Sequence, residues 1–254
     1  MRILMVGDAV AGNGCLYLQQ KLPDLRRKLG IDMTVINGEN SADGNGITEK
    51  SADQLFSAGA DVITTGNHAF RQKNSLPLFD ENDRLLRPAN FHRSAPGKGV
   101  CIVDFGRVRV AVVNLIGRVY MEPNDSPFDC IDRLLPDIDT PNILVDFHAE
   151  ATSEKKVMGY YLDGRVSAVI GTHTHVQTAD ATVLRGGTAY LTDVGMTGAV
   201  YSVLGADVGC AAKKVVANLP VRLNTAGGEM QLNAAVIDLD EKTGKALAVE
   251  TIVL

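Results

Sequence analysis

The chain has 254 residues, which is long for one domain but within the range of α/β folds, and it can bury a large core. Its 45% hydrophobic and 22% charged residues are ordinary globular values. A net charge of −5 argues against a protein that coats nucleic acid, which usually needs a basic face. No apolar run approaches the roughly 20 residues that span a bilayer. We therefore expect a single domain over residues 1–254 that is not embedded in a membrane.

The cysteines and the N-terminus indicate a cellular compartment. The first eight residues turn polar too early for a signal peptide. The four cysteines show no C-x-x-C spacing, and they stand at Cys15, Cys101, Cys130 and Cys210. We therefore expect a cytoplasmic protein whose thiols are reduced and either packed or idle.

The first half of the chain alternates apolar runs with helical patterns. Three runs predict strands, at residues 2–7, 33–38 and 61–66. The leucines of residues 13–29 indicate an amphipathic helix that ends at Gly30, although Pro23 should break or kink it. Thr48 is typical of a helix N-cap and Gly59 of a helix end, which predicts a second helix between them.

The second half is richer in strands. Apolar runs predict them at residues 100–104, 108–115, 143–147, 168–172, 188–192, 229–240 and 247–254. A third helix is expected over residues 152–164, and turns at residues 105–107 and 241–245. The strand–helix–strand alternation predicts largely parallel pairing. Two packed sheets with helices outside them form the simplest architecture.

Five of the predicted strands end, within a few residues, in side chains that can bind a metal. These side chains are Asp8, Glu39, Asn40, Asn67, His68, His148, His173 and His175. In α/β proteins the crevice beyond the carboxyl ends of the strands is where ligands bind. Oxygen and imidazole ligands at one rim are what a two-metal hydrolytic site requires.

Each of these residues also has an ordinary interpretation when taken alone. Asp8 follows a glycine and, like Asn40 and Asn67, is more often a turn residue than a ligand. His173 and His175 alternate with Thr174, so an extended chain would place both rings on one face. Their joint occurrence at five strand ends favours the metal site. Nearby glycines are expected to permit sharp turns beneath it, at Gly38, Gly44, Gly46, Gly66 and Gly171.

Long motifs around these residues resemble the bacterial YmdB-like metallophosphoesterases. The motifs cover residues 7–8, 36–48, 65–68, 87–91, 146–155, 171–180 and 192–198, so the similarity runs over nearly the whole chain. The resemblance implies a calcineurin-like αββα sandwich of two mixed sheets flanked by helices. It also implies a dinuclear metal centre and a hydrolase that acts as a 2′,3′-cyclic nucleotide phosphodiesterase.

The same resemblance implies a role for each ligand. One metal would be held by Asp8, Glu39, Asn40 and His175, and the other by Glu39, Asn67, His148 and His173, with Glu39 bridging. The oxygen and nitrogen ligands favour Mn²⁺ or Fe, and Zn²⁺ stays compatible with them. The wider metallophosphoesterase class opens its site with an Asp-x-His pair, whereas here Ala9 and Val10 follow Asp8. Asn40 would take the vacant histidine position, which makes that site oxygen-rich and argues mildly against Zn²⁺.

His68 is the expected general acid, because it follows the ligand Asn67 and could protonate the leaving ribose oxygen while a bridging hydroxide attacks phosphorus. The alternative is that His68 orients Asn67 or the phosphate. Arg118 could contact phosphate or could simply be exposed. Glu150 and Asp193 could anchor ligand histidines, with loop capping as the competing role.

A small nucleotide is the expected partner, with no stable nucleic-acid complex, and a homo-oligomer is left open. Two other functions also remain open. One is a broader phosphodiesterase or phosphatase, and the other is a nucleotide-sensing regulatory protein that uses the same site.

Overall fold

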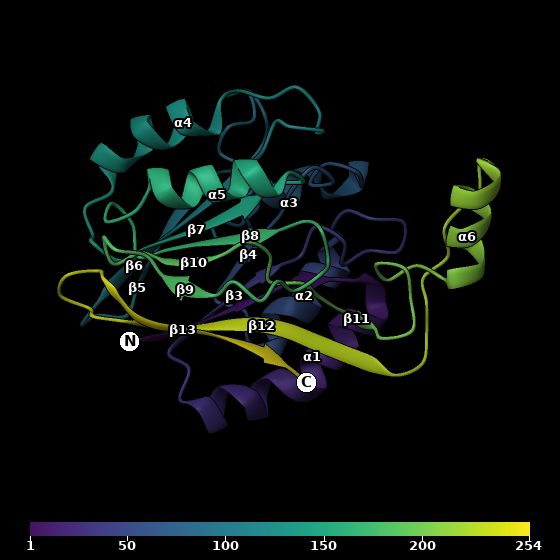
Figure 1. The fold of residues 1–254 in the computed structure, drawn as a ribbon, viewed down its shortest axis with the longest axis horizontal. Coiled ribbons are helices and arrows are strands. Elements are labelled where there is room, and N and C mark those ends of the chain that lie inside the picture. Colours follow the sequence, from purple (N-terminus) through teal and green to yellow (C-terminus); the bar gives the residue numbers. More distant parts are fainter.

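The computed structural model describes residues 1–254 as two β-sheets packed face to face, with helices on both outer faces (Figure 1). The helices are α1 (Ala11–Leu29), α2 (Glu49–Ala58), α3 (Leu76–Glu81), α4 (Pro127–Leu134), α5 (Thr152–Tyr161) and α6 (Val208–Ala217), with short 3₁₀ helices at Lys73–Ser75 and Leu135–Asp137. In Figure 1, α4 and α5 lie over one sheet and α1 lies beyond the other. None of the helices combines the length and apolar composition needed to cross a bilayer.

The first sheet has seven strands. They are β1 (Arg2–Val6), β2 (Asp8–Ala9), β3 (Met33–Asn37), β4 (Val62–Thr64), β11 (Met196–Ala199), β12 (Met230–Leu239) and β13 (Ala246–Val253). β1, β3 and β4 are parallel, whereas β12 runs antiparallel to β1, β11 and β13. The parallel pairing predicted for the first half of the chain is therefore confirmed, and the long β12 makes the sheet mixed.

The second sheet has six strands. They are β5 (Val100–Asp104), β6 (Arg109–Ile116), β7 (Ile143–His148), β8 (Ala168–Thr172), β9 (Thr182–Val183) and β10 (Ala189–Leu191). The central strands β6, β7, β8 and β10 are parallel, and the edge strands β5 and β9 are antiparallel to their neighbours. This sheet is mixed as well, as the resemblance implied.

Side-chain alternation along β1 shows how the layers are held together. Ile3 and Met5 pack between the two sheets, whereas Leu4 and Val6 face α1 and α2. Successive side chains of a strand point to opposite faces, so one apolar run supplies two cores. A third core lies between the second sheet and helices α4 and α5. Each fully buried aliphatic side chain stabilises the fold by about 1.5–3 kcal/mol.

Pro23 was predicted to break or kink the first helix, and the break is wrong. α1 runs without interruption from Ala11 to Leu29 and begins before the expected start. Proline removes one helical hydrogen bond, but Leu18, Leu22 and Leu25 are buried on either side of it and hold the helix against the sheet.

The predicted helix ends are confirmed. Gly30 and Gly59 adopt left-handed conformations that close α1 and α2. Thr48 caps α2, and its side chain accepts a hydrogen bond from the backbone nitrogen of Ser51. The Ser51 hydroxyl in turn accepts one from the Thr48 nitrogen. This reciprocal pair is a capping box, which holds the chain just beyond the loop that carries Glu39 and Asn40.

Candidate metal centre

The site lies where strands of both sheets end side by side. Asp8 follows β1, Glu39 and Asn40 follow β3, and Asn67 and His68 follow β4, all in the first sheet. In the second sheet, His148 is the last residue of β7, and His173 follows β8 directly, with His175 two residues further on. The structure brings together all seven side chains predicted as ligands.

One half of the cluster is built around His175. Its Nε2 lies 3.5 Å from Asp8 Oδ1 and 3.2 Å from the Asn40 amide nitrogen. The same amide nitrogen lies 2.9 Å from Glu39 Oε1 and 3.4 Å from Asp8 Oδ1. Turning this amide over would present its oxygen to the same three groups, which is the orientation that a cation prefers.

The other half is built around His148, which is fully buried. Its Nε2 lies 3.0 Å from Asn67 Oδ1, 3.0 Å from His173 Nδ1 and 3.2 Å from Glu39 Oε2. A ring nitrogen carries at most one proton, so it cannot satisfy three such neighbours at once. Glu39, His148 and His173 offer ligand atoms within 4.8 Å of one another. This donor set fits a metal ion.

Glu39 joins the two halves. Its Oε1 faces Asn40 and its Oε2 faces His148, and the side chain is completely buried. Glycine at position 66 leaves room for the Glu39 carboxylate beside His148. A Cβ on residue 66 would lie 2.2 Å from His148 Nε2 and 2.4 Å from Glu39 Oε2. The chain turns here as expected, and the Ala69 backbone nitrogen donates to the Gly66 carbonyl at 3.1 Å. The φ of Gly66 is not positive, so what requires glycine at this position is the close approach of two ligand side chains.

The buried carboxylate of Asp146 orients His148 through the Thr172 hydroxyl. The His148 Nδ1 lies 2.9 Å from the Thr172 hydroxyl, which donates to Asp146 Oδ1 at 2.7 Å. Burial raises the pKa of Asp146 to about 6, although the neighbouring His148 and hydrogen bonds from Thr64 and Thr172 oppose the shift. The chain Asp146–Thr172–His148 fixes the ring so that Nε2 points into the cluster.

A buried ion pair, which the sequence does not reveal, holds the loop that carries His173 and His175. Lys155 Nζ donates to Asp193 Oδ2 at 2.6 Å and to the Thr172 carbonyl at 2.7 Å. Asp193 Oδ2 also accepts from the backbone nitrogen of Thr174 at 3.0 Å. Asp193 thus fixes the backbone between the two histidines and makes no hydrogen bond to an imidazole ring, which matches loop capping, the competing role, and not histidine anchoring.

The loop needs this support because both histidines adopt left-handed backbone conformations, with φ of 100° at His173 and 63° at His175. Glu150 contributes at the surface, where its Oε2 lies 3.0 Å from His173 Nε2. It therefore occupies the histidine-anchoring position expected for it.

Charge differs sharply between the two histidines of this loop. Burial lowers the pKa of His175, but the Asp8 carboxylate outweighs burial and raises the pKa to about 9. Burial and the neighbouring His148 lower the pKa of His173 to about 4. Without a bound metal, His175 would therefore be cationic at neutral pH and His173 would be neutral.

His68 stands at the opening of the cluster. Its Nδ1 lies 3.2 Å from both Glu39 Oε1 and Asn40 Oδ1, and its backbone nitrogen donates to Glu39 Oε2 at 3.1 Å. Its Nε2 faces outward, 3.4 Å from the Asn45 side-chain amide. The ring is thus fixed at one nitrogen by the cluster and presents the other to a cavity.

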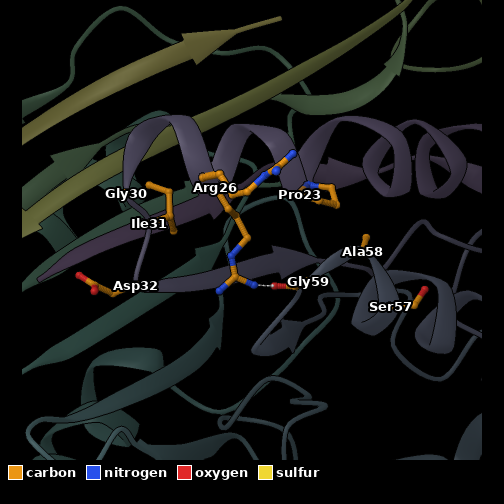
Figure 2. A pocket seen from close by; sticks show the side chains of 9 residues that line it. Pro23, Arg26, Gly30, Ile31, Asp32, Ser57, Ala58 and Gly59 are labelled. Carbon is orange, nitrogen blue, oxygen red and sulfur yellow. Dashed lines mark hydrogen bonds between the residues drawn. The ribbon is translucent and has the colours of Figure 1, made fainter.

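That cavity has a volume of about 480 Å³, and both halves of the cluster contribute to its lining. Arg118 does not line it: its backbone nitrogen is bound by Glu154, and its side chain is exposed. Figure 2 shows another cavity, of about 680 Å³, between the ends of α1 and α2. There Arg26 donates to the Gly59 carbonyl. None of the metal-binding side chains lines this second cavity, so we assign the chemistry to the first.

The two mixed sheets pack between helices and present metal-binding side chains at adjoining strand ends, which is the calcineurin-like αββα sandwich that the resemblance implied. The chain belongs to the family described as YmdB-like protein, whose sequence model matches residues 4–252.

Relatives of known sequence or structure agree with this assignment. A 2′,3′-cyclic-nucleotide 2′-phosphodiesterase of Bacillus subtilis (strain 168) is 47% identical over 256 residues, covering 100% of this chain and 97% of the relative. A crystal structure of a novel phosphatase from Mycoplasma pneumoniae is 32% identical with a TM-score of 0.95, covering 100% of this chain and 93% of that one. A protein from Thermus thermophilus, described as hypothetical, is 39% identical with a TM-score of 0.95, covering 100% and 99%.

Proposed function

We propose that this protein is a metal-dependent phosphodiesterase that hydrolyses 2′,3′-cyclic nucleotides to 3′-nucleotides. The observation that carries the proposal is the position of Glu39 between two sets of metal-binding side chains. One of its carboxylate oxygens faces each set. The substrate class is supported by the relative from Bacillus subtilis, which spans the whole chain.

In this proposal Asp8, Glu39, Asn40 and His175 hold one divalent metal, and Glu39, Asn67, His148 and His173 hold the other. Bound metals would supply an activated water at neutral pH and stabilise charge on the phosphoryl oxygens. The oxygen and imidazole donors favour Mn²⁺ or Fe. Only two of the seven side chains are anionic, so two divalent ions leave the cluster with a charge of about +2, or about +1 once hydroxide is bound.

His68 supplies the proton in the proposed reaction. Its Nδ1 is occupied by the Glu39 carboxylate, so Nε2 is the atom free to donate. A water that has lost one proton to solvent would form the new bond to phosphorus, while the bond between phosphorus and the 2′-oxygen breaks. That oxygen takes the proton from Nε2, and solvent then returns a proton to His68. The product is a 3′-phosphate with a free 2′-hydroxyl.

The charge of the site favours diesters over monoesters. A cluster of about +1 matches the single charge of a phosphodiester. Glu150 and Lys214 line the same cavity with opposite charges, so they add no net positive charge to balance a second phosphate charge. Arg118, for which a phosphate contact and simple exposure were both open, does not line it.

The test is the ratio of kcat/KM for 2′,3′-cyclic AMP to that for 3′-AMP, measured with Mn²⁺-loaded protein. The proposal predicts a ratio well above one, and a monoester hydrolysed more efficiently would overturn it in favour of a broad phosphatase. Tight binding of the cyclic nucleotide without turnover in Mn²⁺ or Fe²⁺ would instead favour the nucleotide sensor.

A further inference from the structure

We infer that residues 203–225 form the wall that binds the nucleoside part of the substrate, an inference that rests on the proposed function. This segment belongs to the long excursion between β11 and β12, and it includes α6. In Figure 1, α6 stands out from the body of the protein, away from both sheets. Only Ala211 of the helix is buried.

The wall and the metal centre line the same cavity. The cluster contributes residues such as Glu39, Asn40 and His175, and His68 lies beside them. The excursion contributes another part of the lining through residues 203–206, 211, 214, 215 and 223–225. The cavity volume of about 480 Å³ falls within the range of about 300–1,000 Å³ that small-molecule sites occupy.

The excursion is tied directly to a metal-binding side chain. The Leu204 carbonyl lies 3.0 Å from His175 Nδ1, which fixes the tautomer that leaves Nε2 available to the cluster. Two backbone hydrogen bonds hold the beginning and the end of this segment together. The Ala226 nitrogen donates to the Gly205 carbonyl and the Asp207 nitrogen to the Asn224 carbonyl, each at 2.8 Å. These contacts fix the position of the wall relative to the metal centre.

The chemistry of the wall suits a nucleobase. Four aliphatic side chains line it, and they are partly or largely exposed in the absence of a ligand: Val203 at 43%, Leu204 at 50%, Val215 at 78% and Leu223 at 42%. Flat heterocyclic bases bury well against such side chains, and the contact is tolerant of base identity because it uses few directional hydrogen bonds.

Lys214 supplies the charge that Arg118 does not. It is the only lysine or arginine among the residues that line the cavity. It lies one turn after Ala211 on α6, so both side chains share the inner face of the helix. Lys214 and the neighbouring Lys213 are both exposed, but Lys213 does not line the cavity. Lys214 is therefore placed to attract the anionic substrate, and Lys213 provides a matched control.

The first experiment compares two substrates that differ only in the base: 2′,3′-cyclic AMP and the 2,3-cyclic phosphate of methyl riboside. Leu223→Ala should raise KM for the nucleotide about tenfold and leave KM for the abasic substrate within about twofold, with kcat little changed. Lys214→Met should raise KM about fivefold for both substrates, and Lys213→Met for neither. Equal effects of Leu223→Ala on both substrates, or equal effects of the two lysine variants, would overturn the inference.

A binding measurement separates this inference from the proposed function. The titrants are 3′-AMP and ribose 3-phosphate, each added to Mn²⁺-loaded wild type and Leu223→Ala. Tighter binding of 3′-AMP by the wild type, lost in the variant, supports the wall even if no substrate is turned over. Equal affinity of the wild type for the two phosphates overturns it, whether or not the protein is a phosphodiesterase.

Discussion

Replacing Lys155 with methionine should destabilise the protein far more than any exposed ion pair could. Lys155 and Asp193 have side chains that are 1% and 0% exposed, so the variant leaves a carboxylate buried without its counter-charge. Removing one partner of such a pair costs about 3–5 kcal/mol. The lost hydrogen bond to the Thr172 carbonyl contributes to the same cost.

The neighbouring Lys156 is the matched control. It pairs with Asp180 at 2.8 Å, but the two side chains are 44% and 30% exposed. Solvent screening limits an exposed pair to about 1 kcal/mol or less, so Lys156→Met should change little. Urea unfolding of the metal-free proteins measures both free energies. A double variant, Lys155→Met with Asp193→Asn, should recover part of the loss because no charge is left buried.

Metal affinity is the second measurement on the same variants. Lys155 and Asp193 hold the backbone on either side of His173, which adopts a left-handed conformation. Without the pair the loop can relax, and Mn²⁺ titration should show weakened binding in Lys155→Met but not in Lys156→Met. Equal free energies of unfolding and equal metal affinities in the two single variants would refute this reasoning.

Other consequences follow from the cluster and its surroundings. Metal analysis after reconstitution with Mn²⁺ or Fe²⁺ should give about two ions per chain, and a single ion in the wild type would contradict the dinuclear arrangement. Glu39→Gln should weaken metal binding at both sites, and Asn40→Ala mainly at one. His68→Ala should lower kcat for 2′,3′-cyclic AMP by about 10²–10⁴-fold and much less for a nitrophenyl diester, whose leaving group needs no proton; equal losses would point to an orienting role. Partial burial would raise the pKa of Asp180, but hydrogen bonds from Lys156 and from nearby threonines outweigh it and hold that pKa well below its ordinary value. The stability that this carboxylate contributes is present above about pH 4 and is lost as the pH falls further, so the gap between wild type and Asp180→Asn should narrow in acid; a gap independent of pH would contradict this.

Much of the site could be predicted because its residues follow strands directly. The positions of Asp8, Glu39 and Asn67 just beyond β1, β3 and β4 require only that parallel strands end at the same edge of a sheet. Likewise, Thr48 and Gly59 bound α2 through contacts within a few residues of themselves. These short-range contacts do not depend on how the rest of the chain folds.

The remainder depends on contacts between residues distant in sequence. Lys155 lies on a helix, where a lysine is normally exposed, and only Asp193 and Thr172 make its burial tolerable. Pro23 was expected to break or kink a helix that tertiary packing keeps continuous. Lys214 and Leu223 line the same cavity as the metal-binding side chains, and no periodic pattern in the sequence places them there.

The most direct test of the proposed function is product formation from 2′,3′-cyclic AMP by one purified sample, before and after reconstitution with Mn²⁺. Chromatography distinguishes 3′-AMP from 2′-AMP and therefore reports which ester bond breaks. We predict that chelated protein forms no product and that reconstituted protein forms 3′-AMP alone. Predominant formation of 2′-AMP, or equal turnover with and without metal, would contradict the proposal that this cluster opens the cyclic phosphate at its 2′-oxygen.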